Sequence, residues 1–171
     1  ATTTDTYNTA VGYAAGTAVT TGVQNVLLGG SAGDSLTSAN NNVAIGYNAM
    51  GSEDTGDGST AVGHSALAAM NYDGYAHNTA IGYHAGKEIT SGIKNTITGG
   101  LAGDAITDGT ENTVYGYFAL SNEDNGASNT AIGAQALGNQ DGANNNTAIG
   151  RQAGLSVSTG GNNTVIGSGA G

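Results

Sequence analysis

The side chains best suited to chemistry are few, and their spacing offers little of it. The three histidines, His64, His77 and His84, form no metal-ligand pair at the spacing of a helix or a strand. The sequence also shows no serine, histidine and acid set, no phosphate-binding loop and no paired catalytic carboxylates. We therefore expect the chain not to be an enzyme and not to bind a metal through its histidines.

Acidic side chains are more numerous than basic ones and gather in a few segments. They include Glu53, Asp54, Asp57, Asp73, Glu123, Asp124 and Asp141. No EF-hand spacing and no glycine-rich calcium nonapeptide is present. We expect these acids to lie in solvated turns, and binding of Ca²⁺ stays open as the alternative.

A short repeated phrase organises the whole chain. The residues Asn-Thr-Ala-Ile-Gly occur at 78–82, 129–133 and 146–150, with near-copies elsewhere. Aligning the copies gives units that start at residues 8, 25, 42, 59, 78, 95, 112, 129, 146 and 163. These starts are evenly spaced, except that the step from 59 to 78 is slightly longer than the others. The sequence thus predicts a lead-in over 1–7 and one repeat domain over 8–171. Positions below are counted from the first residue of each unit.

The repeat indicates short strands joined by turns. Thr, Val and Ile favour strands, and the Gly at position five of every unit suits a corner with positive φ. We predict an all-β fold, a parallel β-solenoid of about ten 17-residue coils that stack ~4.8 Å apart. The Asn at position one should then form an amide ladder. A turn that spans two units, as two similar halves, remains an alternative.

Two positions exchange a bulky side chain between units. Where position nine is Gly, position twelve is aliphatic, as in Val19, Leu36, Ile89, Ile106 and Val157. Where position nine is Met50, Leu67, Leu120 or Leu137, position twelve is Glu53, Met70, Glu123 or Gln140. Such compensation of volume is typical of a close-packed interior.

The repeated strand is apolar on both sides. Strand alternation places positions two and four on one side, and we expect these Thr and aliphatic side chains to face the interior. Position three would then face outward and meet another copy of the chain. The predicted oligomer interface consists of Ala10, Leu27, Ala44, Ala61, Ala80, Ile97, Val114, Ala131, Ala148 and Val165.

Tyrosines recur at position six in alternate units. They are Tyr13, Tyr47, Tyr83 and Tyr117. A row of exposed rings could form a surface stripe that binds glycans. Each ring could instead pack over the small residue in a neighbouring unit, and the sequence leaves both interpretations open.

Runs of the type NTAIGYxAL at this period resemble the repeats of phage tail-fibre and tailspike proteins. They are also similar to the NSVAIG-type repeats in the heads of trimeric autotransporter adhesins, although those repeats are shorter and have one more residue before the Gly. The similarity covers Asn8 to Gly171. It implies a homotrimer and a structural role in a virion fibre that supports host attachment through a receptor or glycan. The alternative is an adhesin head at a bacterial cell surface.

Composition argues against several other roles. Three basic residues and a net charge of −10 disfavour binding to nucleic acid. No apolar run approaches the ~20 residues that span a bilayer, so we expect no membrane insertion. Binding to ice is a third possible function, because regular Thr columns on a flat face can order water. Our placement of the single Thr column in the interior disfavours it.

Overall fold

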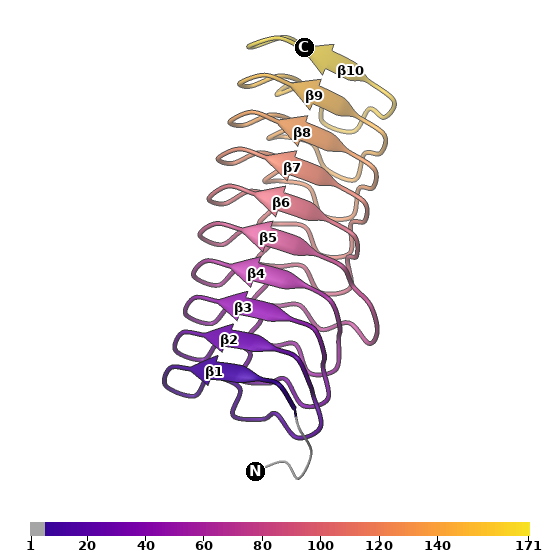
Figure 1. The fold of residues 1–171 in the computed structure, drawn as a ribbon. Helices are drawn as coiled ribbons and strands as arrows, with labels where there is room; N and C mark the ends of the chain where they lie inside the picture. The colour runs from indigo at the N-terminus through magenta and orange to yellow at the C-terminus, as the bar shows by residue number, and fades with distance from the viewer. Residues whose placement is uncertain (1–5) are drawn as a thin grey trace.

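A computed structural model describes residues 6–171, so residues 1–5 of the predicted lead-in lie outside the described part. Each repeat unit contributes one short strand. The strands are β1 (Thr9–Val11), β2 (Val26–Leu28), β3 (Val43–Ile45), β4 (Thr60–Val62), β5 (Thr79–Ile81), β6 (Thr96–Thr98), β7 (Thr113–Tyr115), β8 (Thr130–Ile132), β9 (Thr147–Ile149) and β10 (Thr164–Ile166). They form one sheet in chain order, and Figure 1 shows them stacked along one side of an elongated solenoid. The predicted parallel β-solenoid is confirmed.

The register of the sheet fixes the length of one turn. Every strand pairs in parallel with the same positions of the next, as Thr130 with Thr147 and Ile132 with Ile149. The chain therefore completes one turn in each repeat unit, and the alternative of a turn that spans two units is wrong. The longer unit, which starts at Ser59, places its extra length in a wider turn beyond the sheet, where Asp57 and Tyr75 form an isolated parallel bridge. This turn projects at the right of Figure 1.

Glycine at position five makes the corner after each strand. Its φ lies between 126° and 142° in all ten units, a region that favours glycine. A Cβ on Gly82 would lie 2.5 Å from the carbonyl oxygen of Gly99 in the next coil. The predicted corner is confirmed, and close stacking of the coils adds a second reason for glycine there.

The asparagines at position one form the predicted ladder. The backbone N–H of Asn112 donates to the Oδ1 of Asn95 at 3.0 Å, one coil earlier. The Nδ2 of Asn112 donates to the carbonyl oxygen of Gly126 at 2.8 Å, across its own coil. Each buried amide thereby satisfies one backbone group between coils and one within its coil.

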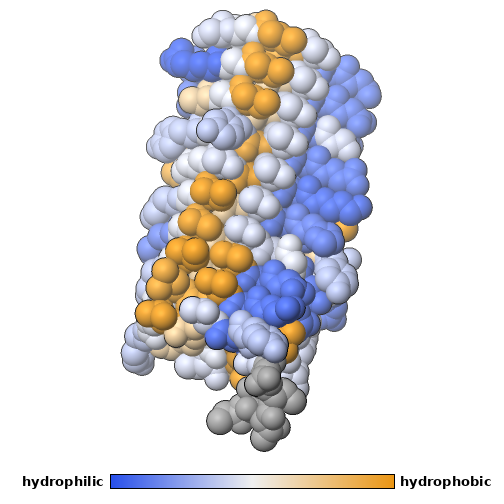
Figure 2. All heavy atoms as spheres, in the orientation of Figure 1, coloured by the Kyte–Doolittle hydropathy of each residue, from blue (hydrophilic) through white to orange (hydrophobic). Residues whose placement is uncertain are grey.

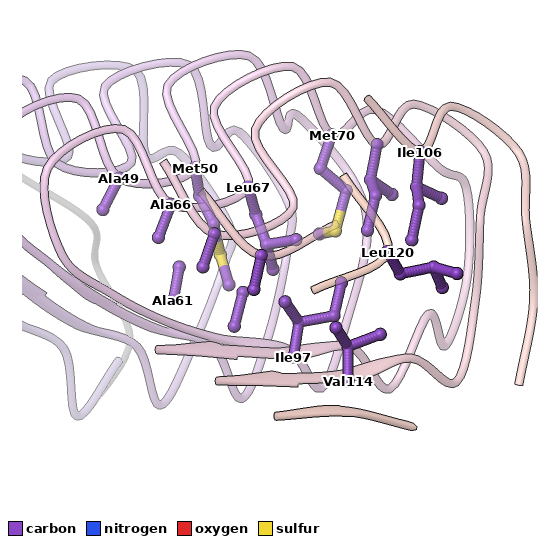
Figure 3. Packing of buried hydrophobic residues seen from close by; sticks show 14 of the residues in the cluster. Ala49, Met50, Ala61, Ala66, Leu67, Met70, Ile97, Ile106, Val114 and Leu120 are labelled. Carbon is purple, nitrogen blue, oxygen red and sulfur yellow. The ribbon is translucent and has the colours of Figure 1, made fainter. Parts of the chain in front are cut away.

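The interior is filled as the exchange between positions nine and twelve predicts. Leu67 and Leu120 at position nine are fully buried, as are Ile89 and Ile106 at position twelve. Figure 3 shows Ile97 and Val114 on the strand side pointing toward the side chains of the opposite wall, Met70 and Ile106 among them. One continuous core runs through the stack.

The expected orientation of the strands is wrong. Position three points into the core, so these side chains cannot contact another copy: Leu27, Ala44, Ala61, Ala80, Ile97, Val114, Ala131 and Ala148 are buried. In the end strands, Ala10 is exposed and Val165 is half-buried against the core. The buried Asn at position one explains the orientation, because position three lies on the same side of the strand.

Candidate functional site

The outer strand face is a partly exposed, mainly apolar surface that follows the sheet through the described coils. We use this name for the side chains at positions two and four of β1–β10. Position four carries Val11, Leu28, Ile45, Val62, Ile81, Thr98, Tyr115, Ile132, Ile149 and Ile166. Position two carries Thr9, Val26, Val43, Thr60, Thr79, Thr96, Thr113, Thr130, Thr147 and Thr164. None of these side chains is charged, and Figure 2 shows the resulting apolar stripe along the molecule.

The outer strand face is a regular array. In-register pairing repeats each position about every 4.8 Å along the stack, and positions two and four lie roughly 6.6 Å apart along a strand. The aliphatic column is interrupted only by Thr98 and Tyr115. Its side chains remain partly open to solvent, with Ile132 37% and Ile166 67% exposed. A surface of this kind suits contact with another regular, uncharged surface.

The tyrosine row lies at the surface beyond the corner glycines. The four rings are 54–89% exposed. A Cβ on Gly30 would lie 3.3 Å from the ring of Tyr47, and one on Gly100 would lie 3.6 Å from the ring of Tyr117. These two rings therefore lie over the small residue of the preceding coil, as the packing interpretation predicts. Much of each ring still remains accessible.

A histidine replaces the small residue at one point of this row. His64 lies between Tyr47 and Tyr83, with ring centroids 5.3 and 5.4 Å away. His84 stacks on Tyr83 at 3.9 Å and lies 5.4 Å from His64. Ligand spacing within one helix or strand does not reveal this pair, because it forms between successive coils. Aligning the units places the two residues at adjacent positions six and seven.

An open groove lies beside the tyrosine row. Its wall includes Phe118, which makes an edge contact with Tyr117 at 4.7 Å between ring centroids. The rest of the lining is mainly small and amide side chains with one leucine, namely Ser121, Asn122, Gln135, Gly138, Asn139 and Leu155. Neutral donors and acceptors next to an aromatic ring could contact a sugar.

The acids at position twelve are buried, so the expectation of solvated turns is wrong for Glu53 and Glu123. The Oε1 of Glu53 accepts hydrogen bonds from the N–H of Gly56 at 2.7 Å and of Asp54 at 3.1 Å. Its Oε2 accepts from the N–H of Tyr72 at 3.3 Å. The carboxylate therefore satisfies three backbone donors of the turn.

The second buried acid belongs to a network that spans two coils. Glu123 accepts from the N–H groups of Gly126 and Gly142 at 2.6 and 2.8 Å. The Nε2 of Gln140 donates to it at 2.7 Å, so an acid and an amide pair at position twelve of two successive coils. These contacts assign both glutamates a structural role in the turns.

Two features bear on metal and membrane binding. Asp124 accepts a hydrogen bond from the hydroxyl of Thr107, and both Asp124 and Asp141 are exposed. Residues 6–171 contain no cluster of three or more His, Asp or Glu side chains around a possible metal position. The same residues form no helix long and apolar enough to cross a membrane.

Burial of Glu53 predicts a dependence of stability on pH. Desolvation raises the pKa of Glu53 in the folded chain, although its backbone hydrogen bonds oppose the rise. The folded chain then binds more protons than the unfolded chain, in which a Glu has a pKa of about 4.3. The stabilisation is complete below that pKa and is lost as the pH rises through the folded pKa.

We expect Glu53→Gln to weaken the fall in unfolding free energy above about pH 4.3. Gln140 shows that an amide fits at position twelve. Urea denaturation at a series of pH values measures the slope, and Glu111→Gln at an exposed site is the control. Equal slopes in the parent and the Glu53 variant would contradict the assignment.

Comparison with family models, with curated proteins and with solved structures finds no match for this chain.

Proposed function

We propose that the chain is a rigid structural segment of a virion fibre that assembles as a homotrimer and supports attachment to a host. The outer strand face carries this proposal. Soluble proteins seldom leave a continuous apolar stripe of this length exposed, and such stripes mark interaction surfaces. A second and a third copy of the chain carry columns of side chains at the same spacing along the stack. The side chains of one copy can therefore meet those of the next along the whole stripe.

Rigidity supports a role as a spacer. Backbone hydrogen bonds join coil to coil on the strands and also in the turns, as from Gly82 to Val62 at 2.8 Å and from Leu120 to Ala136 at 3.0 Å. The asparagine ladder adds a buried row of bonds along the same axis. Ten coils rise roughly 43 Å between the first strand and the last. A segment of this kind holds a receptor-binding part away from the particle.

The tyrosine row is the surface we propose for contact with the host. Tyr13, Tyr47, Tyr83 and Tyr117 present exposed rings, and the groove beside Tyr117 adds amide groups. Aromatic faces and neutral amides are the groups that suit a glycan. The same arrangement would serve the head of a bacterial surface adhesin, which is the alternative location.

Charge on the outer strand face should separate the copies without unfolding them. We expect Ile132→Glu with Ile149→Glu to reduce the mass in solution to that of one chain, because like carboxylates would face each other across the interface. Multi-angle light scattering measures the mass, and circular dichroism checks that the β fold is kept. Tyr83→Ser with Tyr117→Ser is the control and should leave the mass unchanged. Assembly that survives the glutamates, or that fails with the serines, would overturn this interface.

Binding to ice is a second candidate, because the structure removes the argument against it. The Thr column faces outward, and seven threonines from Thr60 to Thr164 follow one another without interruption. Hydroxyl and methyl groups in rows at the spacing of β-strands can order water in a lattice close to that of ice. A monomeric parent that shapes growing ice crystals, and loses this effect with Thr113→Lys and Thr130→Lys, would favour ice binding over the fibre.

A further inference from the structure

We propose that His64 and His84 form a binding site for one divalent transition-metal ion, such as Zn²⁺, Ni²⁺ or Cu²⁺. The two imidazoles come from successive coils, and their ring centroids lie 5.4 Å apart. The backbone N–H of His84 donates to the carbonyl oxygen of His64 at 2.9 Å, which fixes the distance between the two residues. Imidazole is a preferred ligand for each of these ions.

The separation of the rings suits a shared ion. Metal–nitrogen bonds of about 2.1 Å place two nitrogens on one ion roughly 3 Å apart. The nearest ring atoms of two imidazoles are closer than their centroids, so a small adjustment of the side-chain torsions that keeps both rings in the stack would bring one nitrogen of each ring to this distance. Because the described residues offer no third ligand of the His, Asp or Glu type, water would complete the coordination.

The neighbouring rings restrict both histidines. Tyr47 and Tyr83 lie on the two sides of His64, and Tyr83 also stacks on His84 with an angle of 18° between the ring planes. Side chains that are already ordered lose less conformational entropy when they bind a ligand. The stack therefore favours binding by this pair over binding by two isolated surface histidines.

The electrostatic surroundings also permit a cation. Lys87 lies close to His84, because its backbone N–H donates to the carbonyl oxygen of His84 at 3.3 Å. The charge of Lys87 is offset by its ion pair with Glu88. The whole chain carries a net charge of −10, which attracts cations.

His77 provides a matched control within the same chain. Its ring is exposed and stacks on Tyr75 at 5.5 Å, but it has no histidine partner among the ring contacts of the described residues. Isothermal titration of the assembled chain with ZnCl₂ and with NiCl₂ near pH 7.5 should give one ion per chain. His64→Ala and His84→Ala should each weaken binding by at least about tenfold, whereas His77→Ala should not change it.

Three results would overturn the proposal: no binding to the parent, equal weakening by all three variants, or a failure of His64→Ala and His84→Ala to weaken it. Light scattering on the same variants separates this site from the proposed fibre function. Because neither histidine lies on the outer strand face, the mass of the assembly should remain that of the parent in every case.

Discussion

Replacing Gly82 with valine is expected to lower the free energy of unfolding by roughly 3 kcal/mol or more. The φ of Gly82 is 142°, which a β-branched residue adopts only with strain. The added Cβ would also lie 2.5 Å from the carbonyl oxygen of Gly99, and the backbone of a stacked coil cannot move aside without disturbing its own hydrogen bonds. Denaturation in urea measures the loss.

Gly74→Val is the matched control for this substitution. Gly74 also has a positive φ, 120°, but a Cβ there would meet only the ring of Tyr72, at 3.7 Å. The control should show the cost of backbone strain alone and lose less stability than Gly82→Val. Equal losses in the two variants would show that close stacking of the coils does not require glycine at the corner.

Ala131→Glu should destabilise the chain by several kcal/mol. Ala131 points into the core and has no exposed surface, so the carboxylate would be buried without a partner and without space. Ile132→Glu, one residue later in β8, places the same group on the outer strand face, where 37% of the isoleucine is already exposed. This control should keep the parent's stability within about 1 kcal/mol in the separated chain.

The comparison of these two neighbours tests the orientation of the strands. Thermal and urea denaturation give the stability, and they should be run at a concentration where both variants have the same oligomeric state. A stable Ala131→Glu chain together with an unfolded Ile132→Glu chain would contradict the structure. It would instead support the orientation expected from the sequence, in which position four points inward and position three outward.

The period, the corner and the ladder could be predicted because each depends on a residue type with one dominant physical role. Gly at position five and Asn at position one recur at a fixed interval, and stacked coils explain both. The faces of the strand could not be read in the same way, because β8 and its equivalents are short and apolar on both sides. The Asn at position one is the residue that distinguishes the two faces. Because it is buried, position three, on the same side of the strand, also points into the core.

Other features needed comparison across units. Glu53 and Glu123 were expected in solvent because they are charged, yet position twelve carries a core side chain in other units, such as Ile89 and Ile106. Their burial follows from the alignment once backbone donors in the turn are counted as partners. The pair of His64 and His84 likewise depends on which positions lie next to each other in successive coils.

The left-handed residues of the turns carry the weakest sequence signal. The residue at position seven and the last residue before the next unit adopt positive φ throughout the stack, but often without glycine, as at Leu101 and Glu111. Close packing between coils holds these conformations against their local cost of about 1 kcal/mol each. No residue type marks them, so they could be recognised only from the structure.

The mass of the unmodified chain in solution tests the central claim most directly, namely that the outer strand face joins copies of this chain into a fibre segment. Multi-angle light scattering over a range of concentrations should give three times the 16.6 kDa of one chain, without dissociation on dilution. A mass of 16.6 kDa at all concentrations would contradict the account, because the apolar stripe would then be stable in water without a second copy to cover it.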